Sequence, residues 1–250
     1  MVSERDAENG LKEGSALAEQ IKSKDRVADH GEVFTAEREV NAMLDLVKQE
    51  TERIESRFLE PACGTGNFLV EILRRKLDVV KKRYRSSRPE YEKYSVLAVS
   101  SIYGVDLLAD NVQECQERLF EIWRDSYHEV CKNDADEHCE EAVRFILQHN
   151  ILCGNALSMM RVDENGVDTE EPIIFAQWDL MTGDLMKRRD YRLDVLMKEN
   201  DDSENYILFD DEAMNADYWE EDPDTKEMIP KAIREYKPIN YWEVQHGEYI

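Results

Sequence analysis

The chain has 250 residues, enough for one α/β domain with a sizeable core, and it carries a formal charge of −24. Such a charge repels phosphates and argues against a free-standing DNA-binding protein that lacks a local basic patch or a basic partner. The sequence has no apolar run near the ~18 residues that a membrane span needs, and its five cysteines lack paired spacings, so we expect a cytoplasmic protein that contacts no membrane.

The first segment of interest lies at residues 30–47. Residues 1–29 are polar and mixed in charge, and we interpret them as an N-terminal arm. Thr35 is a good N-cap residue, and apolar residues then recur at helical spacing, namely Val40, Met43, Leu44 and Val47. Taken alone, the pattern predicts a capped surface helix.

Residues 58–68 have the layout of a strand, a glycine loop and a helix. Phe58 and Leu59 lead to Glu60, and Pro61 turns the chain into a small-residue loop that ends at Gly66. Leu69, Ile72, Leu73, Leu77 and Val80 then follow a helical period. Glycines let a ligand approach the backbone, and the N-terminus of the helix offers unpaired N–H groups. The loop lacks the Gly-Lys-Ser/Thr ending of a phosphate loop and the third glycine of a dinucleotide loop.

The string Phe-Leu-Glu-Pro-Ala-Cys-Gly-Thr-Gly-Asn-Phe resembles the S-adenosylmethionine loop of the DNA adenine-N6 methyltransferases of restriction–modification systems. The resemblance implies a Rossmann-like, three-layer methyltransferase fold with a mainly parallel sheet in residues 30–198. Residues 31–35 are similar to a second motif of that family, which covers the methionine end of the cofactor, although Ala36 stands where proline is usual. The implied cofactor-binding residues are Phe34, Thr35, Glu60, Ala62, Cys63, Gly64, Gly66 and Asn67.

A basic run follows the first core helix, from Arg74 to Arg88. It stands out in so acidic a chain. We interpret it as a solvated helix end, where cations also suit the helix dipole. The alternative is a patch that contacts phosphates.

The next predicted strand, residues 101–106, also ends in an acid. Apolar residues of a long helix follow it at one-face spacing, from Leu108 to Ile122. By itself Asp106 could cap this helix. In the resembled family the acid at this place holds the ribose hydroxyls of the cofactor, which implies a cofactor contact at Asp106 and the adjoining Leu107.

Residues 126–140 form a polar segment that we interpret as a solvated insertion. Its histidines and cysteines follow no zinc-module spacing, so we predict no metal site. Residues 150–153 predict a third strand. Asn155 and Ala156 follow it, and Asn155 stands where the family usually has an aspartate that meets the adenine of the cofactor.

The catalytic motif of the resembled family, Asp/Asn-Pro-Pro-Tyr/Phe, is absent. The chain has six prolines, and no two are adjacent. The corresponding segment, residues 172–191, is an apolar strand that turns at Gly183, and we favour a β-hairpin there. The alternative is a degenerate clamp for an extruded base formed by Trp178 and Asp179, the only weak catalytic candidates.

Residues 199–250 form an acidic, aromatic-containing extension. Between Glu199 and Met228 the sequence has thirteen acids and one base, which is typical of a solvated linker or a segment that docks on a basic partner. Two functions remain open. The chain is the S-adenosylmethionine-binding part of a DNA adenine-N6 methyltransferase, inactive alone, whose second subunit supplies the catalytic and recognition parts and contacts the DNA. Alternatively, it is a catalytically empty methyltransferase fold that binds or regulates a partner through its acidic surface.

Overall fold

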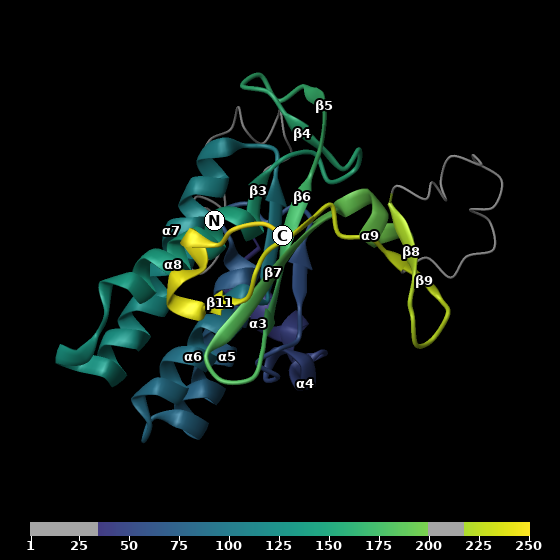
Figure 1. Cartoon of the computed structure of the whole chain (residues 1–250). Coiled ribbons are helices and arrows are strands. Elements are labelled where there is room, and N and C mark those ends of the chain that lie inside the picture. Colours follow the sequence, from purple (N-terminus) through teal and green to yellow (C-terminus); the bar gives the residue numbers. More distant parts are fainter. Residues whose placement is uncertain (1–34, 200–217) are drawn as a thin grey trace, which may run out of the picture. The chain divides into compact units, whose positions relative to one another are not determined.

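The computed structural model describes residues 35–199 and 218–250, which belong to two compact units, 1–48 and 49–250 (Figure 1). The first unit contains α3 (Glu37–Asp45), whose apolar residues Val40 and Leu44 are buried. The N-cap of α3 is Ala36 and not Thr35, because Ala36 has the extended backbone and its carbonyl accepts the first helical hydrogen bonds. A single turn, α4 (Lys48–Thr51), lies at the boundary between the units.

A three-stranded parallel sheet forms the centre of the second unit. Its strands are β1 (Phe58–Glu60), β2 (Ile102–Asp106) and β3 (Ile151–Cys153), in the order β1-β2-β3. Phe58 pairs with Ile102, and Gly104 pairs with Ile151. Parallel neighbours need long crossovers, and helices provide them. They are α5 (Asn67–Tyr84), α6 (Arg88–Ser100), α7 (Ala109–Cys131) and α8 (Glu137–Asn150), with a short 3₁₀ turn η1 (Lys132–Asp134). The three predicted strands are confirmed.

The residues of β2 alternate between two different environments, as a strand requires. A Cβ added to Gly104 would lie 2.9 Å from Leu69 of α5, so this face carries the helices. Tyr103 and Val105 point the other way, into a cluster with Ile173 and Phe175. The second face of the sheet is therefore covered by the segment that follows Pro172.

That segment is a β-hairpin, as the sequence predicts for residues 172–191. Strands β6 (Ile174–Leu180) and β7 (Leu185–Arg192) pair antiparallel along their whole length, and Gly183 in the turn has φ +79°. Figure 1 shows the two strands crossing β3. The hydroxyl of Tyr103 in β2 donates to the carbonyl of Ala176 at 3.0 Å.

The hairpin corrects the expected architecture. The fold is α/β, but among the described residues only β1–β3 pair in parallel, so the strands are not mainly parallel. A hairpin, instead of a layer of helices, covers the second face of the sheet. The physical reason is the short turn at Gly183: it returns the chain beside β6 and leaves no room for the crossover that a parallel strand needs.

The remaining elements are short. Strands β4 (Met160–Val162) and β5 (Asp168–Pro172) form one hairpin, and β8 (Trp219–Glu221) and β9 (Met228–Pro230) form another. Helix α9 (Leu193–Glu199) follows β7. Strands β10 (Arg234–Glu235) and β11 (Ile239–Asn240) pair with β7 and lead into the 3₁₀ helix η4 (Tyr241–His246). The C-terminal residues thus pack on the hairpin, whereas residues 200–217 of the acidic extension lie outside the described part.

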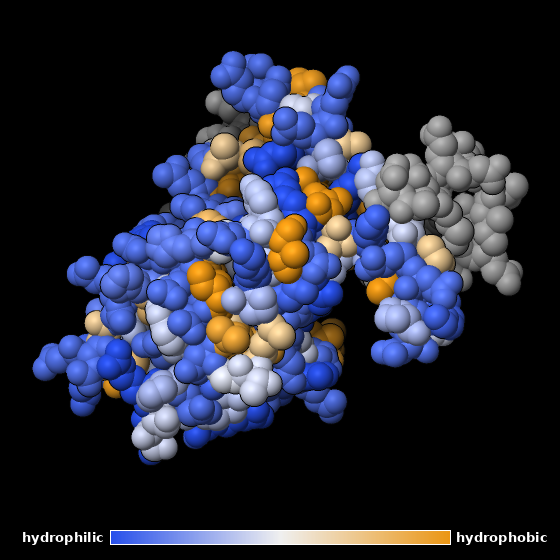
Figure 2. Space-filling model, in the orientation of Figure 1, coloured by the Kyte–Doolittle hydropathy of each residue, from blue (hydrophilic) through white to orange (hydrophobic). Residues whose placement is uncertain are grey.

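Residues 126–140 differ from the expected solvated insertion. Helix α7 continues to Cys131 and α8 begins at Glu137, and Tyr127, Cys131 and Cys139 are buried between them and α6. The polar residues are the outer faces of these helices. Within residues 35–199 and 218–250 no helix is long and apolar enough to cross a bilayer. The face seen in Figure 2 is mainly hydrophilic, with apolar atoms in separate small groups.

Candidate functional site

The loop between β1 and α5 has the backbone shape that its glycines predict. Gly64 has φ +52° and Gly66 has φ +88°, both in the left-handed region that favours glycine. A Cβ on Gly66 would lie 2.5 Å from the sulfur of Cys115 in α7, so the loop also packs tightly against that helix. Helix α5 begins directly at Asn67. Pro61 and Ala62 are exposed, and they leave the outer side of the loop open to a ligand.

Asp106, at the end of β2, holds this loop in place. Its Oδ2 accepts a hydrogen bond from the backbone N–H of Gly64 at 2.9 Å. Its Oδ1 accepts from the N–H of Leu108 at 2.9 Å and from Nδ2 of Asn111 at 3.2 Å. The carboxylate therefore orders the residues just before α7 and joins the ends of two strands. The N-cap of α7 is Leu108 and not Asp106, and the contact of Asp106 with a cofactor stays a prediction.

Arg118 of α7 supports the loop from the other side. Its Nη1 donates to the carbonyl of Thr65 at 2.6 Å, to the Thr65 hydroxyl at 3.0 Å and to Oδ1 of Asn67 at 2.9 Å. The side chain of Asn67 is thus turned toward Arg118. Nothing in the sequence marks Arg118 as a partner of the loop, because it is one of several charged residues on α7 and lies 51 residues from Asn67 and 53 from Thr65.

Glu60 and Cys63 have different roles in the same loop. Glu60 is half-buried at the end of β1, and burial raises the pKa of its carboxyl group. Cys63 is buried, with its N–H bonded to the carbonyl of Val105. A hydrogen bond with Cys115 and burial raise the pKa of the Cys63 thiol, which keeps it protonated. Glu60 can meet a ligand, whereas the side chain of Cys63 packs inward.

The carboxyl end of β3 lies beside the carboxyl end of β2. The N–H of Gly154 donates to the carbonyl of Asp106 at 3.0 Å, and Leu107, which is 42% exposed, lies beside Cys153. Asn155 is engaged by its own hairpin: Nδ2 donates to Asp168 at 2.9 Å and Oδ1 accepts from the N–H of Leu157 at 3.0 Å. Ala156 packs against the apolar cluster under the hairpin.

The structure therefore brings most of the predicted cofactor residues to the carboxyl ends of the parallel strands. Glu60, the 62–67 loop, Asp106, Leu107, Asn155 and Ala156 all follow the carboxyl ends of the parallel strands, where α/β sheets bind ligands. Thr35 belongs to the other compact unit, and Phe34 lies outside the described residues.

Trp178 and Asp179 lie at the opposite end of the parallel strands, near the residues that precede β1 and β3. Trp178 is 3% exposed, and its Nε1 donates to Oδ1 of Asn150, directly before β3. Asp179 pairs with Arg57 at 3.1 Å and with Arg189 at 2.7 Å. Trp178 is thus a packing residue at the amino ends of the strands. This placement argues against a base clamp formed with the glycine loop, and we do not propose one.

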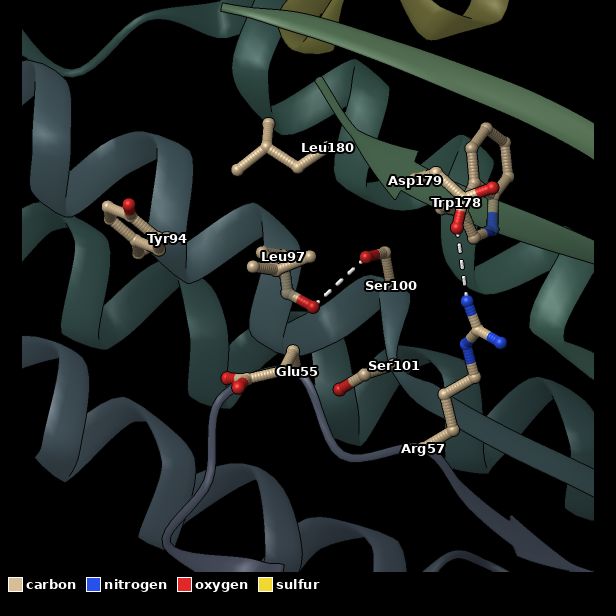
Figure 3. Close-up of a pocket in the computed structure, with 9 residues that line it drawn as sticks. All are labelled: Glu55, Arg57, Tyr94, Leu97, Ser100, Ser101, Trp178, Asp179 and Leu180. Carbon is tan, nitrogen blue, oxygen red and sulfur yellow. Dashed lines mark hydrogen bonds and ion pairs between the residues drawn. The ribbon is translucent and has the colours of Figure 1, made fainter. Parts of the chain in front are cut away.

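A cavity of about 410 Å³ lies beside these two residues (Figure 3). It is lined by residues that precede β1 and β2, by α6 and by the end of β6. Figure 3 shows Arg57 reaching across to Asp179, with Leu97 and Leu180 on the other side. The cavity lies at the amino ends of the parallel strands, and no residue of the glycine loop lines it.

One residue of the basic run is buried and not solvated as the sequence predicts. Lys76 is fully buried, and its ammonium group donates to the carbonyls of Ile54 and Ser56 and to the hydroxyl of Ser101. Other members pair with acids: Arg75 with Glu71 and Lys81 with Glu129. In the described part of the chain, no three His, Cys, Asp or Glu side chains gather in a way that could hold a metal ion.

A comparison with curated proteins finds one significant similarity. The chain is 29% identical over 113 residues to a Methanocaldococcus jannaschii protein named as a candidate type II restriction enzyme and methyltransferase. The match covers 44% of this chain and 9% of the relative, so this chain spans a small part of that protein. No protein-family model matches the chain, and no solved structure matches it. The likeness supports a distant relationship to restriction–modification methyltransferases.

Proposed function

We propose that the chain is the S-adenosylmethionine-binding part of a DNA adenine-N6 methyltransferase of a restriction–modification system. The observation that carries the proposal is a hydrogen bond between the glycine loop and the acid that ends the second strand. The backbone N–H of Gly64 donates to the carboxylate of Asp106 at 2.9 Å. It brings the carboxyl end of β1, the N-terminus of α5 and the acid into one site. The distant relative, which is named as a restriction enzyme and methyltransferase, supports the same class of activity.

The residues of this site fit the cofactor chemically. Glu60 is a carboxylate suited to the amino group of the methionine part, and the exposed backbone at Pro61 and Ala62 allows close approach. Asp106 accepts three hydrogen bonds from the protein, and a carboxylate has about four acceptor positions, so room remains for one ribose hydroxyl. The exposed Leu107 offers an apolar surface to the adenine ring. The cofactor supplies an electrophilic methyl group.

A second polypeptide completes the enzyme in this proposal. The chain has no adjacent prolines, and Trp178 is buried at the opposite edge of the sheet. Extruding a base costs a few kcal/mol, which contacts with the flipped base must recover. With a charge of −24, the chain also needs a basic partner to hold DNA. The same charge favours the second candidate function, a cofactor-binding but catalytically empty protein that docks on a basic partner.

Isothermal titration calorimetry with S-adenosylmethionine tests the cofactor site. We expect the wild-type chain to bind and Glu60→Gln to bind at least about tenfold more weakly, since a hydrogen bond to a charged group contributes about 1.5–3 kcal/mol. Glu121→Gln, an exposed acid on α7, is the matched control and should bind like the wild type. Because burial raises the pKa of Glu60 above its ordinary value of 4.5, wild-type affinity should fall as the pH is lowered from 7 toward 4.5 and Glu60 takes up a proton, whereas Glu60→Gln loses this dependence. Equal affinities and equal pH profiles would contradict the assignment.

A further inference from the structure

Arg118, in the middle of α7, is a partly buried cation that contacts only neutral oxygen atoms in the described part of the chain. Its Nη1 donates to the carbonyl and the hydroxyl of Thr65 and to Oδ1 of Asn67. None of the ion pairs among the described residues includes Arg118, whereas Arg144 of α8 pairs with Glu117 at 2.8 Å. The protein therefore holds an uncompensated positive charge against the glycine loop.

Arg118 acts on the loop through a chain of hydrogen bonds. The carbonyl of Thr65 that accepts from Arg118 belongs to the same peptide group as the N–H of Gly66, and this N–H donates to the carbonyl of Cys63 at 2.8 Å. Hydrogen bonds in such a chain polarise and strengthen one another. The guanidinium group therefore tightens the turn that precedes α5 and places a positive charge beside it.

The charges at the proposed cofactor site are arranged with opposite signs at its two ends. Glu60 and Asp106 place carboxylates at the carboxyl ends of β1 and β2. Toward α5, the charge comes from Arg118, and the first turn of that 18-residue helix contains no acid. The helix dipole adds to the positive field there. The amino-acid end of S-adenosylmethionine carries one ammonium and one carboxylate group, so it matches these charges in one orientation.

We propose that Arg118 is a positioning residue that makes the site select the carboxylate of the cofactor's amino-acid end. Its charge attracts the carboxylate toward the first turn of α5, where helix N–H groups without partners in the helix can donate to it, while Glu60 receives the ammonium group. Arg118 acts through residues 65–67 and needs no contact with the ligand. The inference rests on the proposed function, and it adds the orientation of the cofactor and the residue that determines it.

The dependence of binding on the carboxylate separates this role from mere support of the loop. Decarboxylated S-adenosylmethionine keeps the adenosine, the sulfonium and the ammonium group, and it lacks only the carboxylate. Calorimetry gives the ratio of the two affinities for each chain. A general loosening of the loop weakens both ligands and cancels from this ratio. We expect the wild type to prefer S-adenosylmethionine by about tenfold or more, because the carboxylate makes charge-assisted hydrogen bonds.

Two substitutions of Arg118 isolate its charge. Arg118→Gln should lower the preference for S-adenosylmethionine at least about fivefold, because the new side chain is polar but carries no charge. Arg118→Lys keeps the charge and should restore most of the preference. The matched control is Arg124→Gln, which changes the net charge equally on the same helix, since Arg124 lies over the ring of Phe120 at 5.7 Å from its centre. This control should keep the wild-type preference.

A measurement on the unsubstituted chain covers the case in which Arg118→Gln does not fold. In ¹⁵N spectra of the wild type, S-adenosylmethionine should shift the side-chain Nε–H signal of Arg118. The decarboxylated ligand should leave this signal nearly unchanged, because it brings no negative charge to the start of α5. Equal shifts with both ligands would contradict the proposed role.

The calorimetric outcomes distinguish this inference from the proposed function. A wild type that binds both ligands equally, or an Arg118→Gln variant that keeps the wild-type preference, overturns the role of Arg118. An Arg118→Lys variant that behaves like Arg118→Gln also overturns it, because the charge then does not decide the preference. If the wild type binds neither ligand, the proposed function fails and this role fails with it. If S-adenosylmethionine binds and its preference does not depend on Arg118, the inference alone fails.

Discussion

Lys76 joins three parts of the chain at the amino ends of β1 and β2. Its ammonium group donates to the carbonyls of Ile54 and Ser56 and to the hydroxyl of Ser101. Burial lowers its pKa to about 7, because the charged form is poorly solvated there. Lys76 thereby fixes the segment before β1 against the residue before β2.

The lowered pKa of Lys76 predicts a pH dependence of stability. Below pH 7 the lysine is charged in both the folded and the unfolded chain, and the cost of burying the charge is fully present. As the pH rises through the folded pKa toward the unfolded value of 10.5, the folded chain binds fewer protons and the cost is relieved. The free energy of unfolding should therefore rise, from this residue, by about 2 kcal/mol between pH 7 and pH 8.5.

Urea unfolding of the wild type and of Lys76→Met at these two pH values measures the effect. The variant leaves the carbonyls of Ile54 and Ser56 without their donor, so it starts from a lower stability, but it has no group to titrate at this place. The difference between the two chains should grow with pH. Curves that stay parallel between pH 7 and pH 8.5 would show that Lys76 keeps an ordinary pKa.

At the scale of the elements, the loop between β1 and α5 depends on glycine for two separable reasons. Gly66 has φ +88° and no room for a Cβ beside Cys115. Gly183 in the β6–β7 turn has φ +79° but open space around it. Both Gly→Ala variants therefore carry backbone strain, and only Gly66→Ala adds a steric conflict.

We expect Gly66→Ala to lower the free energy of unfolding by about 1–3 kcal/mol more than Gly183→Ala does. Thermal and urea unfolding of the two variants beside the wild type give the comparison. Gly66→Ala should also weaken cofactor binding, because the loop must shift away from α7, whereas Gly183→Ala should not. Equal losses of stability in both variants would mean that α7 yields to the added methyl group.

The elements that the sequence predicts well are those with local signals. The strand at Phe58–Glu60 ends in a turn-forming proline, and the apolar stripe from Leu69 to Val80 has a helical period. The hairpin around Gly183 follows from its turn residue. The parallel arrangement of the strands follows from the helices between them, because a strand–helix–strand connection is almost always a right-handed crossover. These patterns depend on neighbours in sequence, so one chain suffices to find them.

What the sequence could not show depends on contacts between distant segments. Nothing local distinguishes the buried Lys76 from the solvated cations around it. Nothing local shows that the side chain of Asn155 donates a hydrogen bond to Asp168, thirteen residues away. The two-sided covering of the parallel sheet, with helices on one face and a hairpin on the other, depends on where Tyr103 and Phe175 meet. Arg118 reaches Thr65 and Asn67 only in the folded chain.

At the scale of the whole molecule, the proposed cofactor loop belongs to a strongly acidic chain. Its charge is −24, and several cations of the basic run are paired with acids. We therefore expect the purified chain to transfer no methyl group from tritiated S-adenosylmethionine to mixed-sequence DNA. Adding the polypeptide encoded by the neighbouring gene should produce labelled adenine if that polypeptide carries the Pro-Pro motif. Strong labelling of adenine by the chain alone would contradict the need for a partner.

The most direct test of the central claim is where S-adenosylmethionine binds on the intact chain. Chemical-shift mapping of backbone amides in a deuterated, ¹⁵N-labelled sample gives this answer without any substitution. We predict that the cofactor shifts the signals of Glu60, Gly64, Gly66 and Leu107, together with residues at the end of β3, and leaves Arg57, Ser101 and Asp179 unchanged. The account would be contradicted if millimolar cofactor shifts no amide signals, or shifts only those of residues that line the cavity at the amino ends of the strands.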